Sequence, residues 1–111
     1  MTARRFDLRV EQGSDYHLTI PVVDNAGTPY VVVGWSARGQ VRRSLDDEEP
    51  VYELDDHLTV GATTVELNLP GEAISEWTWR QARYDIELVN PEGRPTRLLE
   101  GHVFVSPEVT R

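Results

Sequence analysis

The amino-acid sequence predicts an all-β protein, an antiparallel immunoglobulin-like β-sandwich of seven to eight strands with one short helix. Most segments alternate apolar and polar residues, which is typical of half-buried strands. Turn-forming residues recur between these segments, and no long stretch has helical periodicity. The chain of 111 residues is near the usual size of one domain, so residues 1–111 are expected to form a single sandwich.

The first half of the chain contains the clearest strand. Residues 6–11 and 16–22 alternate, and Pro21 predicts that the second of these strands lies at a sheet edge or is interrupted there. Residues 24–27 form a turn signal. Residues 35–42 then alternate most regularly, with small and apolar residues on one face and polar, basic residues on the other.

The remaining elements are expected in this order: a short strand at 51–54, a hairpin of 58–60 with 65–69, a helical segment within 72–80, a strand at 84–88, a turn at 90–93 and one or two strands within 97–106. Four residues on the apolar faces of the two best strands are predicted to be core: Trp35, Tyr84, Ile86 and Leu88. Tyr84 opens its strand after a loop, so its hydroxyl is also a candidate to hold the preceding connection, as in a tyrosine corner.

Composition excludes several function classes. The formal net charge is −8, which disfavours nucleic acid as a partner because phosphate contacts need clustered basic residues. There is no cysteine, so disulfides and thiolate chemistry are excluded. No apolar run approaches the ~20 residues of a membrane-spanning helix, and no signal peptide is recognised. We therefore expect neither a nucleic-acid nor a membrane partner.

No motif in the sequence indicates catalysis, a cofactor or a resident metal. His17, His57 and His102 form no metal-binding pair and are predicted at the surface. The acidic residues at 46–49 and 55–56 offer oxygen ligands for calcium, but adjacent acids without glycine are more typical of a solvated loop. Paired carboxylates for glycoside hydrolysis would need a cleft that a small sandwich rarely supplies. The chain is therefore predicted not to be an enzyme.

The three tryptophans leave two interpretations open. Trp35, Trp77 and Trp79 could form a carbohydrate-stacking platform, or Trp35 and Tyr84 could be core anchors while one of Trp77 and Trp79 plugs the end of the sandwich. Trp77 and Trp79 share a face only if the chain is extended there. The core interpretation is favoured.

Four segments together resemble small structural proteins of tailed bacteriophages and prophages, and in particular the immunoglobulin-like N-terminal domain of phage baseplate upper proteins. The segments are VEQGSDY at 10–16, GWSARGQVR at 34–42, YDIEL at 84–88 and RLLEGHVFVSPEVTR at 97–111. In that family the Gly-aromatic pair usually follows Leu-Thr, whereas this chain has Val32 and Val33 there.

The resemblance implies a non-enzymatic virion structural protein that is made in the host bacterial cytoplasm and built into the particle as a symmetric homo-oligomer. A tail- or baseplate-associated position is the leading hypothesis, with contacts to other virion structural proteins. The alternatives are a capsid decoration or head-to-tail protein and a carbohydrate-binding module on the virion surface. Arg38, Gln40 and Arg42 share one strand face and are predicted to form the interface. The competing interpretation is a solvated face whose arginines pair with acids of the same chain.

Overall fold

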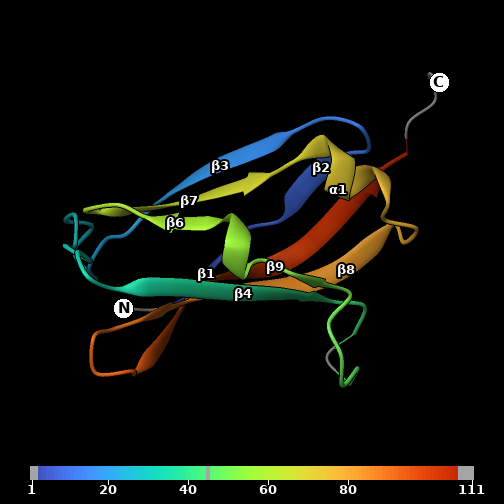
Figure 1. Ribbon diagram of the computed structural model, residues 1–111. Helices are drawn as coiled ribbons and strands as arrows, with labels where there is room; N and C mark the ends of the chain where they lie inside the picture. Colours follow the sequence, from blue (N-terminus) through green and yellow to red (C-terminus); the bar gives the residue numbers. More distant parts are fainter. Residues whose placement is uncertain (1–2, 45, 108–111) are drawn as a thin grey trace.

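Two β-sheets pack face to face in the computed structural model, which describes residues 3–44 and 46–107 (Figure 1). A six-stranded sheet has the order β1-β9-β8-β4-β5, with β2 also paired to β9, and a three-stranded sheet has the order β3-β7-β6. The elements are β1 (Arg4–Arg5), β2 (Leu8–Glu11), β3 (Tyr16–Pro21), β4 (Ser36–Arg42), β5 (Tyr52–Glu53), a 3₁₀ turn (Asp55–His57), β6 (Leu58–Val60), β7 (Thr64–Leu69), α1 (Gly71–Ser75), β8 (Gln81–Val89) and β9 (Pro95–Ser106).

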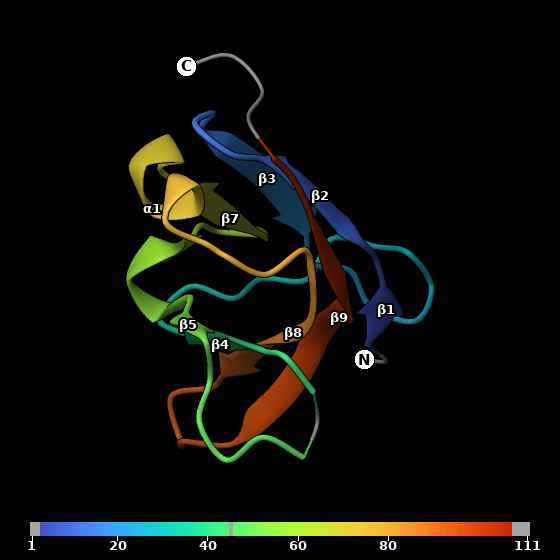
Figure 2. The same cartoon turned by 90° about the vertical axis from the view of Figure 1, so that its right-hand side faces the viewer.

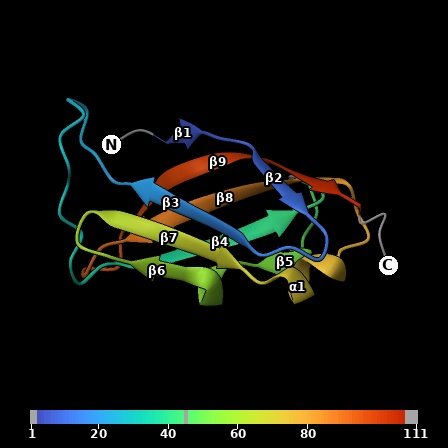
Figure 3. The same cartoon turned by 90° about the horizontal axis from the view of Figure 1, so that it is seen from above.

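This strand order confirms the predicted all-β sandwich. The central group β9-β8-β4-β5 faces the group β3-β7-β6, which is the arrangement of an immunoglobulin-like fold (Figure 3). The β6–β7 hairpin is confirmed, and β3 lies at an edge of its sheet, as Pro21 predicted.

The prediction that all strands are antiparallel was wrong. β1 and β2 run parallel to β9, with Leu8 opposite Val103 and Val10 opposite Val105. Residue alternation reports which face a side chain occupies, but it does not report strand direction. Gly101 permits the close approach, because a Cβ at this position would collide with the carbonyl oxygen of Phe6, between β1 and β2.

The core lies between the two sheets and consists of the inward residues of each strand. Tyr84, Ile86 and Leu88 are buried as predicted. Trp35 is only half-buried: it precedes β4, packs against the rim of the core, and meets Tyr30 edge to face with ring centroids 5.9 Å apart. The prediction that Trp35 is a core residue was therefore too strong, because it precedes β4 and packs only against the outside of the core.

The helical segment is shorter than the predicted span of 72–80. α1 ends at Ser75, and the chain from there to β8 is irregular, so Trp77 and Trp79 fall on one side of the backbone and stack with centroids 4.8 Å apart. Both rings are buried, at 5% and 7% exposure. The segment that carries them follows α1 and leads into β8 at this end of the sandwich (Figure 2). One of these tryptophans was predicted to be buried at the end of the sandwich, and the structure buries both, so a stacking platform for carbohydrate is not available there.

Two turns are built in the same way. Asp24 Oδ1 accepts the backbone N–H groups of residues 26 and 28, and Asn90 Oδ1 accepts those of residues 92 and 94. Each turn then needs a left-handed residue, which Gly27 and Gly93 supply with φ of 84°. The turn signals in the sequence are confirmed at both places.

Candidate functional site: the charged face

The outward side chains of β4, β8 and β9 form a surface that we call the charged face. Strand register arranges these side chains in three cross-strand rows. The first row is Arg38, Glu87 and Arg97; the second, with Glu53 of β5, is Gln40, Asp85 and Glu100; the third is Arg42, Arg83 and His102. Side chains in neighbouring rows alternate with buried residues along each strand, so the rows are held by the core beneath them.

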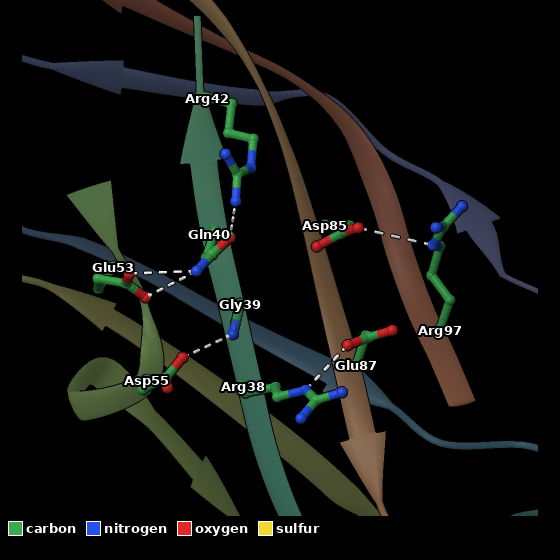
Figure 4. A network of polar contacts seen from close by, with 9 residues as sticks. All are labelled: Arg38, Gly39, Gln40, Arg42, Glu53, Asp55, Asp85, Glu87 and Arg97. Atoms are coloured by element: carbon green, nitrogen blue, oxygen red, sulfur yellow. Dashed lines mark hydrogen bonds and ion pairs between the residues drawn. The ribbon is translucent and has the colours of Figure 1, made fainter. Parts of the chain in front are cut away.

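The predicted interface residues do share one face, and each makes contacts within the chain (Figure 4). Arg38 Nε donates to Glu87 Oε1 at 2.9 Å. Gln40 Nε2 donates to Glu53 Oε1 at 3.1 Å and its Oε1 accepts from Arg42 Nη2 at 2.7 Å. Arg38 thus pairs with an acid of the same chain, as the competing interpretation of a solvated face predicted. Arg42 does not: it contacts Gln40 and, at 2.6 Å, the backbone oxygen of Asp47. Their role as an interface stays a prediction.

The second row carries an excess of negative charge. Asp85, Glu100 and Glu53 lie along it, and one cation, Arg97, is placed 3.6 Å from Asp85 and 3.3 Å from Glu100. Partial burial raises the pKa of Asp85 above its ordinary value, and the negative charges of its acidic neighbours act in the same direction, while Arg97 and, more weakly, Arg42 oppose them. Asp85 is therefore an acid whose charge is incompletely compensated within the chain.

The third row carries an excess of positive charge. Arg42 and Arg83 lie directly opposite each other on β4 and β8, an arrangement that is unfavourable for like charges. In the described part of the chain, neither has a carboxylate within ion-pair distance. His102 follows on β9; its Nδ1 accepts from Arg5 Nη2 at 3.2 Å, and Asp7 Oδ1 lies 3.7 Å from the same atom. Basic side chains therefore gather along this row in a protein of net charge −8.

The charged face is hollowed rather than flat. A shallow pocket of about 440 Å³ spans the rows, and its lining includes Gln40, Arg42, Arg83, Asp85 and Glu100. A second hollow of about 380 Å³ continues past the third row, with Arg43 and Ser44 added to its rim. Most residues that line the two hollows are polar or charged, so this surface suits charged partners better than an apolar ligand.

The other candidate residues are distributed elsewhere. His17 lies on the outer face of the three-stranded sheet near Glu66, and His57 Nε2 is 2.7 Å from the Tyr52 hydroxyl. Asp55 is used structurally, since its Oδ1 accepts the backbone N–H of Gly39 at 2.9 Å. Among the described residues there is no group of acids and histidines arranged to hold a metal ion.

The hydroxyl of Tyr84 has a different partner from the one predicted. It donates to the carbonyl oxygen of Phe6 at 2.5 Å, so it ties β8 to the bend between β1 and β2 and not to the preceding connection. Burial raises the pKa of this hydroxyl well above its ordinary value. The expectation of a tyrosine corner was therefore wrong about the segment that is held.

Comparison with known proteins adds no family assignment: the sequence matches no family model and no curated protein. In residues 3–44 and 46–107, no helix is long and apolar enough to cross a membrane.

Sequence reasoning found only one strand of the charged face. Arg83, Asp85 and Glu100 were not singled out, although the alternation of β8 already placed Asp85 on the polar side, and His102 was predicted only as a surface histidine. The missing information was register, because it decides that Arg83 faces Arg42 and that Asp85 faces Gln40.

Proposed function

We propose that this chain is a non-enzymatic structural protein of a bacteriophage virion, associated with the tail or baseplate, and that it acts through protein–protein contacts of the charged face. The observation that carries the contact surface is the set of uncompensated charges in cross-strand register, in particular Arg42 opposite Arg83. Two like charges that lie side by side repel each other, unless a group of opposite charge binds between them.

The virion assignment rests on the sequence resemblance, and the strands within the similar segments are neighbours in the fold. Segment 10–16 includes the end of β2, segment 34–42 contains β4, segment 84–88 lies in β8, and segment 97–111 includes most of β9. These strands are neighbours in the six-stranded sheet, in the order β2-β9-β8-β4. Most of the described residues in these segments thus belong to one continuous sheet, whose outer side is the charged face.

A carbohydrate-binding role has lost its main support. It required coplanar exposed tryptophans, and the stacked pair Trp77 and Trp79 is buried. A protein contact surface needs no such platform. It needs charged and polar groups held rigidly on strands, which β4, β8 and β9 supply.

The test is the composition of phage particles assembled from the genome that encodes this chain. Quantitative mass spectrometry should find the chain in purified particles at a small multiple of three or six copies, as a tail or baseplate ring requires. A capsid decoration protein would be present in far more copies. Absence of the chain from the particles contradicts the proposed function.

The contact surface is tested separately with Arg38→Ala combined with Arg42→Ala. We expect this double variant to fold and to enter particles at reduced occupancy. Normal occupancy would show that these two arginines are only part of a charged surface.

A further inference from the structure

The rows of the charged face have opposite charge and lie next to each other. The second row has Asp85 on β8 and Glu100 on β9, and the third row has Arg83 and His102 on the same two strands. Consecutive outward positions of one strand are about 6.8 Å apart, so acid and base are separated by one pleat repeat. This order makes the face complementary to itself.

We propose that the charged face binds the charged face of a second copy of this chain through a two-fold axis that runs between the second and third rows. A rotation of 180° about this axis exchanges the positions of the two rows, so that the third row of one copy meets the second row of the other. Arg83 then meets Asp85 of the second copy, and His102 with Arg5 meets Glu100. An isologous contact repeats each of these pairs twice.

The dimensions of packed sheets suit this arrangement. Sheets that face each other lie about 10 Å apart, a distance that a long arginine and a short aspartate can bridge together. Aligned sheets cross at about 30°, which displaces the outer strands more than the central one. The pair formed by Arg83 and Asp85 lies on β8, between β4 and β9, so it is the pair that such a rotation disturbs least.

The surroundings of the two charges favour a partner of opposite sign. Arg83 has Arg42 and His102 as its cross-strand neighbours. Asp85 pairs with Arg97, which it shares with Glu100, and the positive charge of Arg42 acts on it more weakly. A second copy would bring a carboxylate to the crowded bases and a guanidinium to the crowded acids. The net charge of −8 on each copy opposes this approach, but at 0.15 M salt a Debye length of about 8 Å screens the overall repulsion more than the direct contacts.

The contact should be weak. Four strands about 4.8 Å apart and three rows about 6.8 Å apart cover roughly 400 Å² per copy. A standard interface uses about 800 Å² per partner, so we expect a dissociation constant on the order of 10⁻⁴ M for free protein. Repetition in a symmetric particle would strengthen such a contact through effective concentration. The inference thus rests on the proposed function for its setting and names the partner of the same face.

Two charge reversals test the pairing. Arg83→Glu places acid against acid, and Asp85→Arg places base against base, so each variant alone should self-associate at least about tenfold more weakly than the wild type in sedimentation equilibrium. In an equimolar mixture the two variants become complementary, because Glu at 83 of one meets Arg at 85 of the other while the remaining Asp85 meets the remaining Arg83. Association should therefore return in the mixture.

Matched controls separate contact from net charge. Arg94→Glu, in the exposed turn between β8 and β9, repeats the charge change of Arg83→Glu, and Glu66→Arg, on the outer side of the other sheet, repeats that of Asp85→Arg. Neither control should alter self-association. If the controls weaken it as much as the face variants do, overall charge is responsible and the proposed pairing is overturned.

The wild type alone provides a test that does not depend on folded variants. On dilution from about 1 mM, amide chemical shifts should change on the central strand around Tyr84 and not on β3 or β7. Protein that stays monomeric at this concentration overturns the second copy as the partner, as does a variant mixture that fails to associate. If the protein is monomeric but enters particles, this inference is wrong and the proposed function stands. If the protein dimerises as described but is absent from particles, the inference stands and the proposed function is wrong.

Discussion

The two faces of strand β8 are built from alternate residues of one segment, and different interactions determine what each face contributes. Tyr84, Ile86 and Leu88 point inward and are buried, whereas Arg83, Asp85 and Glu87 point outward in a charged array. On the inner face, stability comes from burial and close packing, which depend on volume. On the outer face, charges partly exposed to water contribute little to stability, so their arrangement is free to serve contacts with other molecules.

The largest expected difference between the two faces is at neighbouring positions of β8. Ile86→Ala should destabilise the protein by about 2–5 kcal/mol, because it removes buried methyl and methylene groups and leaves a cavity. Glu87→Ala should change stability by less than about 1 kcal/mol, since its ion pair with Arg38 is partly exposed. Urea unfolding of both variants gives the comparison. Equal effects would contradict the separation of roles.

Substitution of Trp35, at the rim of the core, should cause an intermediate loss of stability. Trp35→Ala should destabilise the protein by less than the roughly 3–5 kcal/mol typical of a buried tryptophan, because the ring is only half-buried. Trp77→Ala should show the full loss, since that ring is 5% exposed and stacked on Trp79. Thermal and urea unfolding rank the two variants. An unchanged stability of the Trp35 variant would remove this residue from the core altogether.

A smaller effect is expected for the hydroxyl of Tyr84, the polar group on the inner side of β8. Tyr84→Phe keeps the ring and removes only the hydrogen bond to the Phe6 carbonyl, so the cost should be about 1 kcal/mol. Amide hydrogen exchange should increase at the bend between β1 and β2 more than on β7. If exchange increases equally everywhere, the hydroxyl does not hold that bend specifically.

On the outer face, removing the charge of Asp85 should stabilise the protein, whereas the substitutions on the inner face destabilise it. Its raised pKa means that the folded protein keeps the proton at a pH where the unfolded chain has lost it. Folding is thus favoured most below the ordinary pKa of about 3.8, and this contribution is lost as the pH rises through the folded-state value. Asp85→Asn should therefore be slightly more stable than the wild type at pH 7, by less than about 1 kcal/mol.

Thermal melts of the Asp85→Asn variant and the wild type at pH 4 and pH 7 measure this difference, which should shrink at the lower pH. Glu92→Gln, in the exposed turn between β8 and β9, is the control and should show no such trend. A variant less stable than the wild type at pH 7 would mean that the ion pair with Arg97 outweighs the cost of burying the charge.

The smallest effect on stability is expected from the interface residues. Arg38→Ala with Arg42→Ala should leave the melting temperature nearly unchanged, because the contacts of both arginines are partly exposed. A loss of several kcal/mol would show that these side chains support the fold itself. The contrast with Ile86→Ala would then no longer describe the two sides of the sheet.

The sequence by itself determined most of the strands and which face most of their residues occupy; β1 and the exposed position of Phe6 outside a strand were not predicted. Alternation at 84–88 predicted the buried side of β8, and the pattern at 35–42 placed Arg38, Gln40 and Arg42 on one surface. Turn chemistry was equally local, since Asp24 and Asn90 bond to backbone groups only a few residues away. These features were predictable because their causes lie within one segment of the chain.

Only the tertiary structure decided which strands are neighbours, in which direction they run and in which register. β1 and β2 run parallel to β9, Trp77 stacks on Trp79 because α1 ends at Ser75, and the rows of the charged face exist because Arg83 is opposite both Arg42 and His102. A shift of one residue in any of these pairings would preserve the alternation within each strand while changing every cross-strand contact. The charge pattern of the candidate site is a property of register, and register is set by how the whole core packs.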